Sequence, residues 1–184
     1  MRIIAGTKRG QTIQAPKGRD TRPTLDRVRE SLFGIIQFEV AGQTVLDLFA
    51  GSGSLGLEAL SRGAAHAVFN DSARESIAVV RANLAKLGLS QQATVYSMGH
   101  LAAIQAVARA GFRFDLVFLD PPYRAGLLEE TLAALRTAGV LAPNCRVIAE
   151  HAANQPPETP PGFSLRDRRK YGIAGISIFE EEQG

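Results

Sequence analysis

Residues 47–56 read DLFAGSGSLG, and this stretch decides the fold class. Its first three residues end an apolar, strand-like run at residues 45–49, and its last two begin a helix predicted over residues 55–62. Glycines at the spacing GxGxxG let the chain turn tightly and let a ligand approach the backbone, and the start of the helix offers free N–H groups. A strand, a glycine loop and a helix in this order predict a cofactor-binding, Rossmann-like unit. The spacing by itself suits a dinucleotide as well as other ligands.

The pattern around the glycine loop alternates between strands and helices. Strand-like runs are predicted at residues 45–49, 66–71, 94–98, 114–119 and 146–150, and helices at residues 25–38, 55–62, 74–87, 101–110 and 127–138. Two further strand-like segments, 163–168 and 173–179, predict a final hairpin. Nearly all-apolar strands that alternate with helices are typical of a parallel sheet covered on both faces. We therefore predict an α/β fold with a doubly wound sheet, in which the ligand lies beyond the carboxyl ends of the strands.

The first 24 residues predict a basic extension in front of one compact domain at residues 25–184. Strand-like pieces at residues 2–5 and 11–14 flank a turn, which predicts a small β-hairpin. Residues 1–30 hold eight Lys or Arg and three Asp or Glu, a charge of +5, whereas the whole chain carries +3. This asymmetry favours a polyanionic partner at one end of the molecule. A solvated basic arm without a partner stays open on charge alone.

Composition narrows the class of protein. The chain has 184 residues, 45% of them hydrophobic and 21% charged, as expected of one soluble globular domain. No apolar run approaches the roughly 20 residues of a membrane span. Cys145 is the single cysteine and the three histidines share no metal-ligand spacing, so we predict no metal site and a reducing, cytoplasmic location.

Two acidic residues favour a cationic adenosine ligand over a dinucleotide. Asp47 precedes the glycines, where its carboxylate suits an ammonium group and would repel a pyrophosphate. Asp71 ends the second strand, about 20 residues further on, and can accept hydrogen bonds from ribose hydroxyls. The alternative for Asp47 is a local role as a helix cap.

The sequence DPPY at residues 120–123 directly follows the strand at residues 114–119. Prolines hold the backbone extended and remove donors, so carbonyl groups can point into a cleft. An exocyclic amine of a base is a poor nucleophile, and hydrogen bonds from it to Asp120 and the Pro121 carbonyl would aim its lone pair at a methyl donor. Tyr123 would stack on a base that has left its helix. A rigid turn after the strand is the alternative interpretation.

The chain resembles a known family along nearly its whole length. DPPY after the fourth strand is similar to the catalytic motif of amino-methyltransferases that act on adenine, cytosine or guanine amines. MRIIAG at residues 1–6, TRPT at 21–24 with DRVRE at 26–30, DLFAGSG at 47–53 and LEALSRGA at 57–64 resemble the bacterial 16S rRNA (guanine-N2)-methyltransferases of the RsmD type.

This resemblance implies a Rossmann-like class I methyltransferase with a mostly parallel, seven-stranded sheet and S-adenosylmethionine as cofactor. The implied cofactor-binding residues are Asp47, Ala50, Gly51, Ser52, Gly53, Asp71 and Met98. The family usually has Glu followed two positions later by Asp at the end of the second strand, where this chain has Asp71, Ser72 and Ala73. After the third strand, Met98 stands near the place where an acidic residue or Asn often receives the adenine amine; it would pack on the adenine or, as the pattern slightly favours, belong to the core.

The resemblance also implies the substrate. Asp120, Pro121 and Tyr123 would handle the target guanine, and Lys8, Arg9 and Arg22 would bind RNA. The implied partner is 16S rRNA, within the 30S subunit or an assembly intermediate, and the implied state is a monomer. Three alternatives stay open from the residues: a DNA adenine or cytosine amino-methyltransferase, a dinucleotide-dependent oxidoreductase, and an inactive RNA-binding protein.

Overall fold

The computed structural model describes residues 1–16, 23–122 and 126–182. Two residues predicted to act in the site, Arg22 and Tyr123, lie outside the described residues. The elements, in chain order, are α1 (Pro23–Ile35), β1 (Thr44–Asp47), α2 (Ser54–Ser61), β2 (His66–Asn70), α3 (Arg74–Leu87), the short 3-10 helix η1 (Ser90–Gln92), β3 (Ala93–Tyr96), α4 (His100–Arg109), β4 (Phe114–Leu119), α5 (Leu127–Thr137), β5 (Leu141–Ala152), β6 (Phe163–Tyr171) and β7 (Ala174–Glu181).

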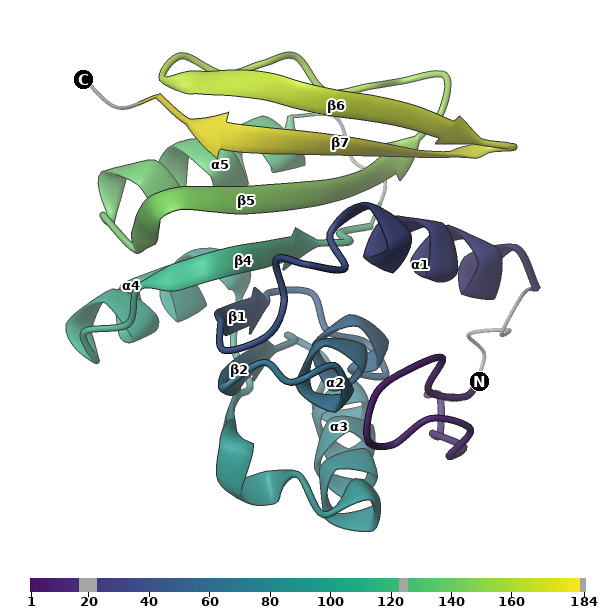
Figure 1. Ribbon diagram of the computed structural model, residues 1–184. Helices are drawn as coiled ribbons and strands as arrows, with labels where there is room; N and C mark the ends of the chain where they lie inside the picture. Colours follow the sequence, from purple (N-terminus) through teal and green to yellow (C-terminus); the bar gives the residue numbers. More distant parts are fainter. Residues whose placement is uncertain (17–22, 123–125, 183–184) are drawn as a thin grey trace.

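The strands form one seven-stranded sheet in the order β3-β2-β1-β4-β5-β7-β6 (Figure 1). The first five strands pair in parallel, and β7 pairs antiparallel with both β5 and β6. The chain runs outward from β1 to β3 on one side and then returns to β4 beside β1. The loops after β1 and β4 therefore diverge at the centre of the sheet, which is the place where ligands bind in folds of this kind. The prediction of a mostly parallel, doubly wound sheet is confirmed.

Helices cover both faces of the sheet. In Figure 1, α1, α2 and α3 lie on one face, and α4 and α5 lie on the other. The first layer packs through fully buried side chains such as Phe33 and Phe118, whose ring centroids are 5.7 Å apart. The second layer packs through Ile104, Leu132 and neighbouring apolar residues. Burial of each such side chain contributes roughly 1.5–3 kcal/mol, so the sheet is held from both sides.

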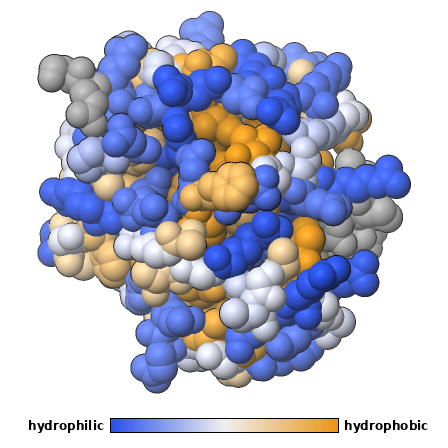
Figure 2. Space-filling view, in the orientation of Figure 1, coloured by the Kyte–Doolittle hydropathy of each residue, from blue (hydrophilic) through white to orange (hydrophobic). Residues whose placement is uncertain are grey.

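The face of the molecule seen in Figure 1 is mainly polar. Figure 2 shows hydrophilic residues over most of the face seen in Figure 1, with a smaller apolar patch near its centre. Within the described part of the chain, no helix has the length and apolar character needed to cross a membrane.

Two regions differ from the pattern predicted from the sequence. Strand β5 begins at Leu141 rather than near residue 146, and its pairing with β4 shifts register where it passes Pro143 and Asn144. Asn144 has a positive φ of 63°. A proline and a left-handed residue are unusual inside a strand, which is why this part of β5 did not look strand-like.

The predicted N-terminal hairpin is reduced to a single antiparallel bridge between Arg2 and Thr12. Ile3 N–H donates to the Gln11 carbonyl at 2.9 Å, so the two segments do run side by side. The amides of Ile4 and Ala5 instead donate to a side chain of α2, which leaves no regular ladder between two strands.

Candidate active site

The glycine loop between β1 and α2 depends on each of its three glycines. Gly51 and Gly53 have φ values of 56° and 79°, in the left-handed region that favours glycine. At Gly56 a Cβ atom would lie 2.3 Å from Cε1 of Phe69, a buried residue of β2. The first two glycines therefore shape the loop, and the third allows α2 to pack closely on the sheet.

Asp47 lies beneath this loop and is almost fully buried, at 1% exposure. Its Oδ2 accepts a hydrogen bond from the Gly56 amide at 3.0 Å. Burial raises the pKa of Asp47 to about 7; the Gly56 bond opposes this shift, and the charges of Asp120 and Asp71 add to it. Asp47 thus stabilises the first turn of α2 through its hydrogen bond to Gly56. Its ionised form is disfavoured by burial and by the neighbouring carboxylates.

Asp71 joins the end of β2 to the glycine loop. Its Oδ2 accepts a hydrogen bond from the Gly51 amide at 2.9 Å, and its Oδ1 accepts one from the Ala73 amide at 2.8 Å. The side chain is 8% exposed, and each oxygen retains a further lone pair. These bonds fix the position of the carboxylate relative to the loop.

Met98 follows β3 and is half-buried against the second core layer. Its backbone amide and carbonyl both bond to the side chain of Asn70, the last residue of β2. Asn70 also donates to the Leu48 carbonyl, so it links the ends of three neighbouring strands. Sequence reasoning missed Asn70, whose position at a strand end was the available signal.

Asp120 and Glu150 lie beside each other at the carboxyl ends of β4 and β5. Leu119 and Ala149 are paired in the parallel register, which makes Asp120 and Glu150 the next residues on the two strands. Burial raises the pKa of Glu150 to about 8, and the charge of Asp120 adds to the shift. Sequence reasoning missed Glu150, although it is the last residue of the apolar strand predicted at residues 146–150, just as Asp71 and Asp120 stand at the ends of theirs.

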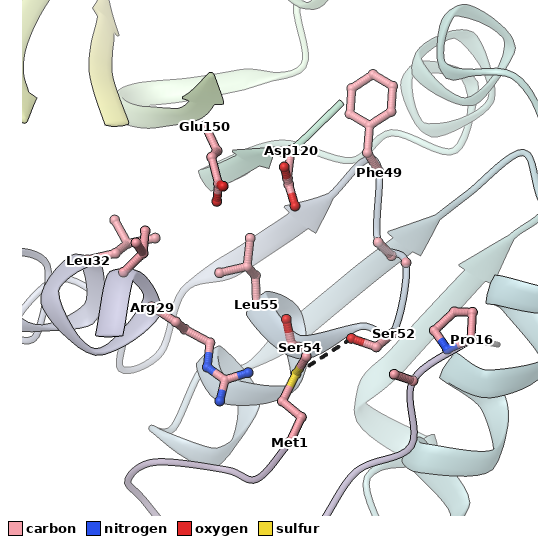
Figure 3. A pocket seen from close by; sticks show the side chains of 14 residues that line it. Met1, Pro16, Arg29, Leu32, Phe49, Ser52, Ser54, Leu55, Asp120 and Glu150 are labelled. Carbon is pink, nitrogen blue, oxygen red and sulfur yellow. Dashed lines mark hydrogen bonds between the residues drawn. The ribbon is translucent and has the colours of Figure 1, made fainter. Parts of the chain in front are cut away.

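A pocket opens between these carboxylates, the glycine loop and α1. Figure 3 shows Asp120 and Glu150 pointing into it from the strand ends, with Arg29 reaching it from α1. It is lined by Met1, Ala15, Pro16, Val28, Arg29, Leu32, Phe49, Ala50, Gly51, Ser52, Ser54, Leu55, Asp120 and Glu150.

The pocket therefore brings Asp120 together with three of the predicted cofactor-binding residues, Ala50, Gly51 and Ser52. The other described residues predicted for the site do not line it: Asp47, Gly53, Asp71, Met98 and Pro121. Pro121 lines a second pocket, formed with the start of α5 and the proline-rich loop, and Glu150 lines both. Within the described residues, no group of three or more His, Cys, Asp or Glu side chains could hold a metal ion.

Comparison with known proteins identifies the family. A family model described as "Conserved hypothetical protein 95" matches residues 1–180. The chain belongs to this family.

Relatives in the family share the chain's full length. "Ribosomal RNA small subunit methyltransferase D" of Escherichia coli strain K12 is 38% identical over 183 residues, covering 99% of this chain and 90% of the relative. "Putative rRNA methyltransferase YlbH" of Bacillus subtilis is 38% identical over 182 residues, covering 98% and 99%. A solved structure described as "Putative methyltransferase yhhF from Escherichia coli" matches with a TM-score of 0.88 at 37% identity, covering 100% and 99%. The family resemblance and the class I methyltransferase fold predicted from the sequence are confirmed.

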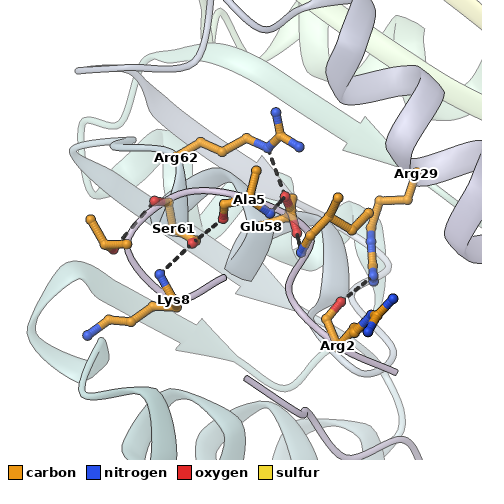
Figure 4. A network of polar contacts seen from close by, with 9 residues as sticks. Arg2, Ala5, Lys8, Arg29, Glu58, Ser61 and Arg62 are labelled. Atoms are coloured by element: carbon orange, nitrogen blue, oxygen red, sulfur yellow. Dashed lines mark hydrogen bonds and ion pairs between the residues drawn. The ribbon is translucent and has the colours of Figure 1, made fainter. Parts of the chain in front are cut away.

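In this family member the N-terminal segment is fastened along α2 by a buried acid. Glu58 is fully buried, and its carboxylate accepts hydrogen bonds from the amides of Ile4 at 2.8 Å and Ala5 at 3.0 Å (Figure 4). Nε of Arg62 donates to the same carboxylate at 2.8 Å. Gly6 passes so close to the end of α2 that a Cβ atom would collide with the Ser61 carbonyl.

Both ends of this segment, at Met1 and Pro16, line the pocket, and the turn between them lies at the far end of α2. Near the start of α2, Asn83 Nδ2 donates to the carbonyls of both Gln14 and Ser52 at 3.0 Å, which ties the segment to the glycine loop. At the far end, the Lys8 amide donates to the Ser61 hydroxyl at 3.0 Å. An eight-residue helix is about 12 Å long. Lys8 and Arg9 therefore lie at the end of α2 remote from the pocket.

Arg29 is a further residue of the site that sequence reasoning did not select. It is 4% exposed, and its Nη2 donates to the Arg2 carbonyl at 2.6 Å. It approaches the pocket from the side opposite the strand ends (Figure 3). A single arginine within a basic segment gave no signal that it would be buried.

Proposed function

We propose that this protein transfers a methyl group from S-adenosylmethionine to the exocyclic N2 amine of a guanine in 16S rRNA. The observation that carries the proposal is the position of Asp120, which follows β4 and faces a pocket lined by the glycine loop. We further propose that the protein acts as a monomer in the cytoplasm, on the 30S subunit or an assembly intermediate. The relatives named as rRNA methyltransferases support this substrate class.

The charges of the site fit S-adenosylmethionine. This donor carries a sulfonium and an ammonium group, and when bound it supplies an electrophilic methyl group. Asp47 and Glu150 have raised pKa values because they are buried close to other carboxylates. Cationic groups nearby would relieve that repulsion, whereas a pyrophosphate would increase it. Arg29, on the other side of the pocket, carries a positive charge that would attract the carboxylate of the same donor.

The glycine loop and the strand ends would hold the donor. Gly51 and Gly53 let the backbone approach it, with Ala50 and Ser52 beside them. Asp71 would accept hydrogen bonds from the ribose through its remaining lone pairs. Met98 would lie towards the adenine, beyond the described pocket.

Asp120 and Pro121 would hold the target amine. Two N–H groups directed at the Asp120 carboxylate and the Pro121 carbonyl would turn the nitrogen lone pair towards the methyl group. As the new N–C bond forms and the S–C bond to the methyl group breaks, Asp120 Oδ would accept the proton that leaves the nitrogen. Tyr123 would stack on the base, as predicted from the motif. Lys8, Arg9 and Arg22 would contact RNA outside the pocket.

RNA is favoured over the DNA alternative. The named relatives are described as rRNA methyltransferases, and none of the relatives named here is described as acting on DNA. The oxidoreductase alternative assigns no role to Asp120, Pro121 and Tyr123. An inactive RNA-binding protein would have no need of the carboxylates that meet at the glycine loop.

The test is methyl transfer from labelled S-adenosylmethionine to 30S particles that lack guanine-N2 methylation, with naked 16S rRNA and DNA in parallel. We expect incorporation at a guanine N2 in the wild type and a loss of about 100-fold or more with Asp120→Ala. The matched control is Asp167→Ala, which removes a carboxylate from edge strand β6, where Asp167 pairs with Arg169. Donor binding without incorporation into any of the three substrates would exclude the proposed reaction.

A further inference from the structure

Glu150 is a second carboxylate at the reacting end of the pocket. Because Leu119 pairs with Ala149, Asp120 and Glu150 occupy matching positions on neighbouring parallel strands, which lie about 4.8 Å apart. Figure 3 shows both carboxylates directed towards the same space above Leu55. Glu150 also lines the neighbouring pocket that contains Pro121, so it lies between the two hollows.

The surroundings of Glu150 leave its carboxylate in need of donors. Among the described residues, no hydrogen-bond donor reaches the Glu150 side chain, and its charged neighbour Asp120 repels it. A half-buried carboxylate in this situation is stabilised by N–H groups that arrive with a ligand. A residue kept only to support the fold would be expected to carry its own donor, as Glu58 does.

The bases differ in whether a hydrogen-bond donor or an acceptor lies beside the exocyclic amine that a pair of carboxylates would contact. Guanine presents N1–H beside its N2 amine, so donors follow one another along that edge. Adenine presents N1, and cytosine N3, as an acceptor beside the amine. If Asp120 accepts from the amine, an acceptor at the adjacent position would face Glu150, and two acceptors would repel each other.

We propose that Glu150 determines the choice of base: its carboxylate, ionised when the cationic donor is bound in the same pocket, accepts the N1–H of the target guanine while Asp120 accepts from the N2 amine. This inference rests on the proposed function and names the group that makes it specific for guanine. Glu150 then leaves adenine and cytosine with an unpaired, repelled edge. A buried group left without its partner can reject the wrong substrate strongly.

The test uses an RNA in which the target guanine is replaced by 2-aminopurine, which keeps the 2-amino group but has an acceptor at N1. The modified 16S rRNA is assembled by ligation and reconstituted into 30S particles. Single-turnover rates are compared for guanine and 2-aminopurine with the wild type, Glu150→Gln and the control Glu182→Gln. Glu182 is exposed after β7, and its substitution makes the same chemical change far from the pocket.

We expect the wild type and Glu182→Gln to prefer guanine equally. Glu150→Gln should slow guanine methylation by about 10-fold, because the neutral amide oxygen accepts the N1–H more weakly than a carboxylate does. Because a glutamine amide can donate to the N1 acceptor, the guanine to 2-aminopurine ratio should fall by about 10-fold or more. Differences in intrinsic reactivity between the two bases cancel when the ratios of the two enzymes are compared.

An unchanged ratio in a slower Glu150→Gln enzyme would overturn the proposal and assign Glu150 to holding the donor or the fold. Calorimetric binding of S-adenosylmethionine separates those two, and a loss of donor affinity with an unchanged ratio points to the donor. If Glu150→Gln folds poorly, Glu150→Asp keeps the charge, and its guanine preference should remain within about threefold of the wild type; loss of that preference counts against the proposal. Absence of guanine methylation by the wild type would defeat the proposed function itself.

Discussion

At the scale of single residues, the site holds carboxyl groups where ionisation is unfavourable. Asp47 and Glu150 have pKa values of about 7 and about 8, against ordinary values of 3.8 and 4.5. Burial is the main cause in both cases, and repulsion from Asp120 contributes to both. The protein therefore tolerates an electrostatic cost at the place where we propose that a cationic donor binds.

These shifts predict how the stability of the ligand-free protein depends on pH. A carboxyl group whose pKa is raised by folding binds more protons in the folded state, so stability falls as pH rises from the unfolded pKa through the folded one. For Glu150 this interval runs from about 4.5 to about 8. We expect Glu150→Gln to gain stability relative to the wild type across that interval, by an amount on the order of 1–3 kcal/mol.

Urea unfolding at several pH values from 5 to about 9 measures this effect. The free energy of unfolding of Glu182→Gln should follow that of the wild type, since Glu182 is exposed. Parallel curves for Glu150→Gln and the wild type would show that Glu150 is not destabilised by its charge.

At the scale of elements, the N-terminal segment is built into the domain rather than attached to it loosely. Ile3 and Ile13 are buried in the same core layer as α1 and α2. Glu58 of α2 and Asn83 of α3 each form hydrogen bonds with its backbone. The segment thus places basic residues at a fixed distance from the pocket, where they could follow the phosphates that flank a target base.

Lys8 and Arg9 are the residues that should show this role. We expect Lys8→Ala combined with Arg9→Ala to weaken binding to 30S particles and 16S rRNA, and to reduce the slope of log affinity against log salt by about 1–2. Binding of S-adenosylmethionine should not change, because neither residue lines the pocket. The measurement is a filter-binding titration at several salt concentrations.

The control for this prediction is Arg169→Ala combined with Lys170→Ala, an exposed basic pair on β6. It removes the same charge from the edge strand of the sheet. Equal losses in the two double variants would mean that net charge, rather than the N-terminal segment, supports RNA binding.

At the scale of the whole molecule, the site exists because the chain reverses its direction of winding at the centre of the sheet. β1 lies between β2 and β4, so the loop after β1 and the residues after β4 leave the sheet towards opposite sides and open a pocket between them. Arg29 from α1, Ser52 from the glycine loop, Asp120 from β4 and Glu150 from β5 then meet in that pocket. Layers of helix on both faces keep these strand ends in place.

A ligand that binds across this junction should stabilise the whole domain. At a concentration of about 100 times its dissociation constant, S-adenosylmethionine should add about 2.7 kcal/mol to the stability and raise Tm by about 5–10 °C. NADH at the same concentration should produce no shift, because its pyrophosphate would meet the carboxylates of the site. Differential scanning fluorimetry with both ligands checks this, and stabilisation by NADH alone would favour the oxidoreductase alternative.

Local patterns made much of the fold and part of the site predictable. The glycine loop and the position of Asp120 after a strand are each encoded within about ten consecutive residues, and each strand or helix is indicated by the periodicity within its own segment. Their physical causes are also local: allowed φ values at glycine, the periodicity of apolar side chains, and the rigidity of proline. Asp47, Asp71 and the residues around Gly51 could be selected for the same reason.

The sequence by itself determined the family, the order of the elements and the end of the sheet at which ligands bind. Tertiary structure alone decided that Glu150 lies beside Asp120 and that the buried Glu58 binds the backbone of the N-terminal segment. It also decided that Lys8 lies at the end of α2 remote from the pocket. Each of these depends on the register or packing of segments 30 to 54 residues apart in the sequence. That register is set by the total burial of apolar surface in two core layers, a property of the whole chain that no single stretch of sequence contains.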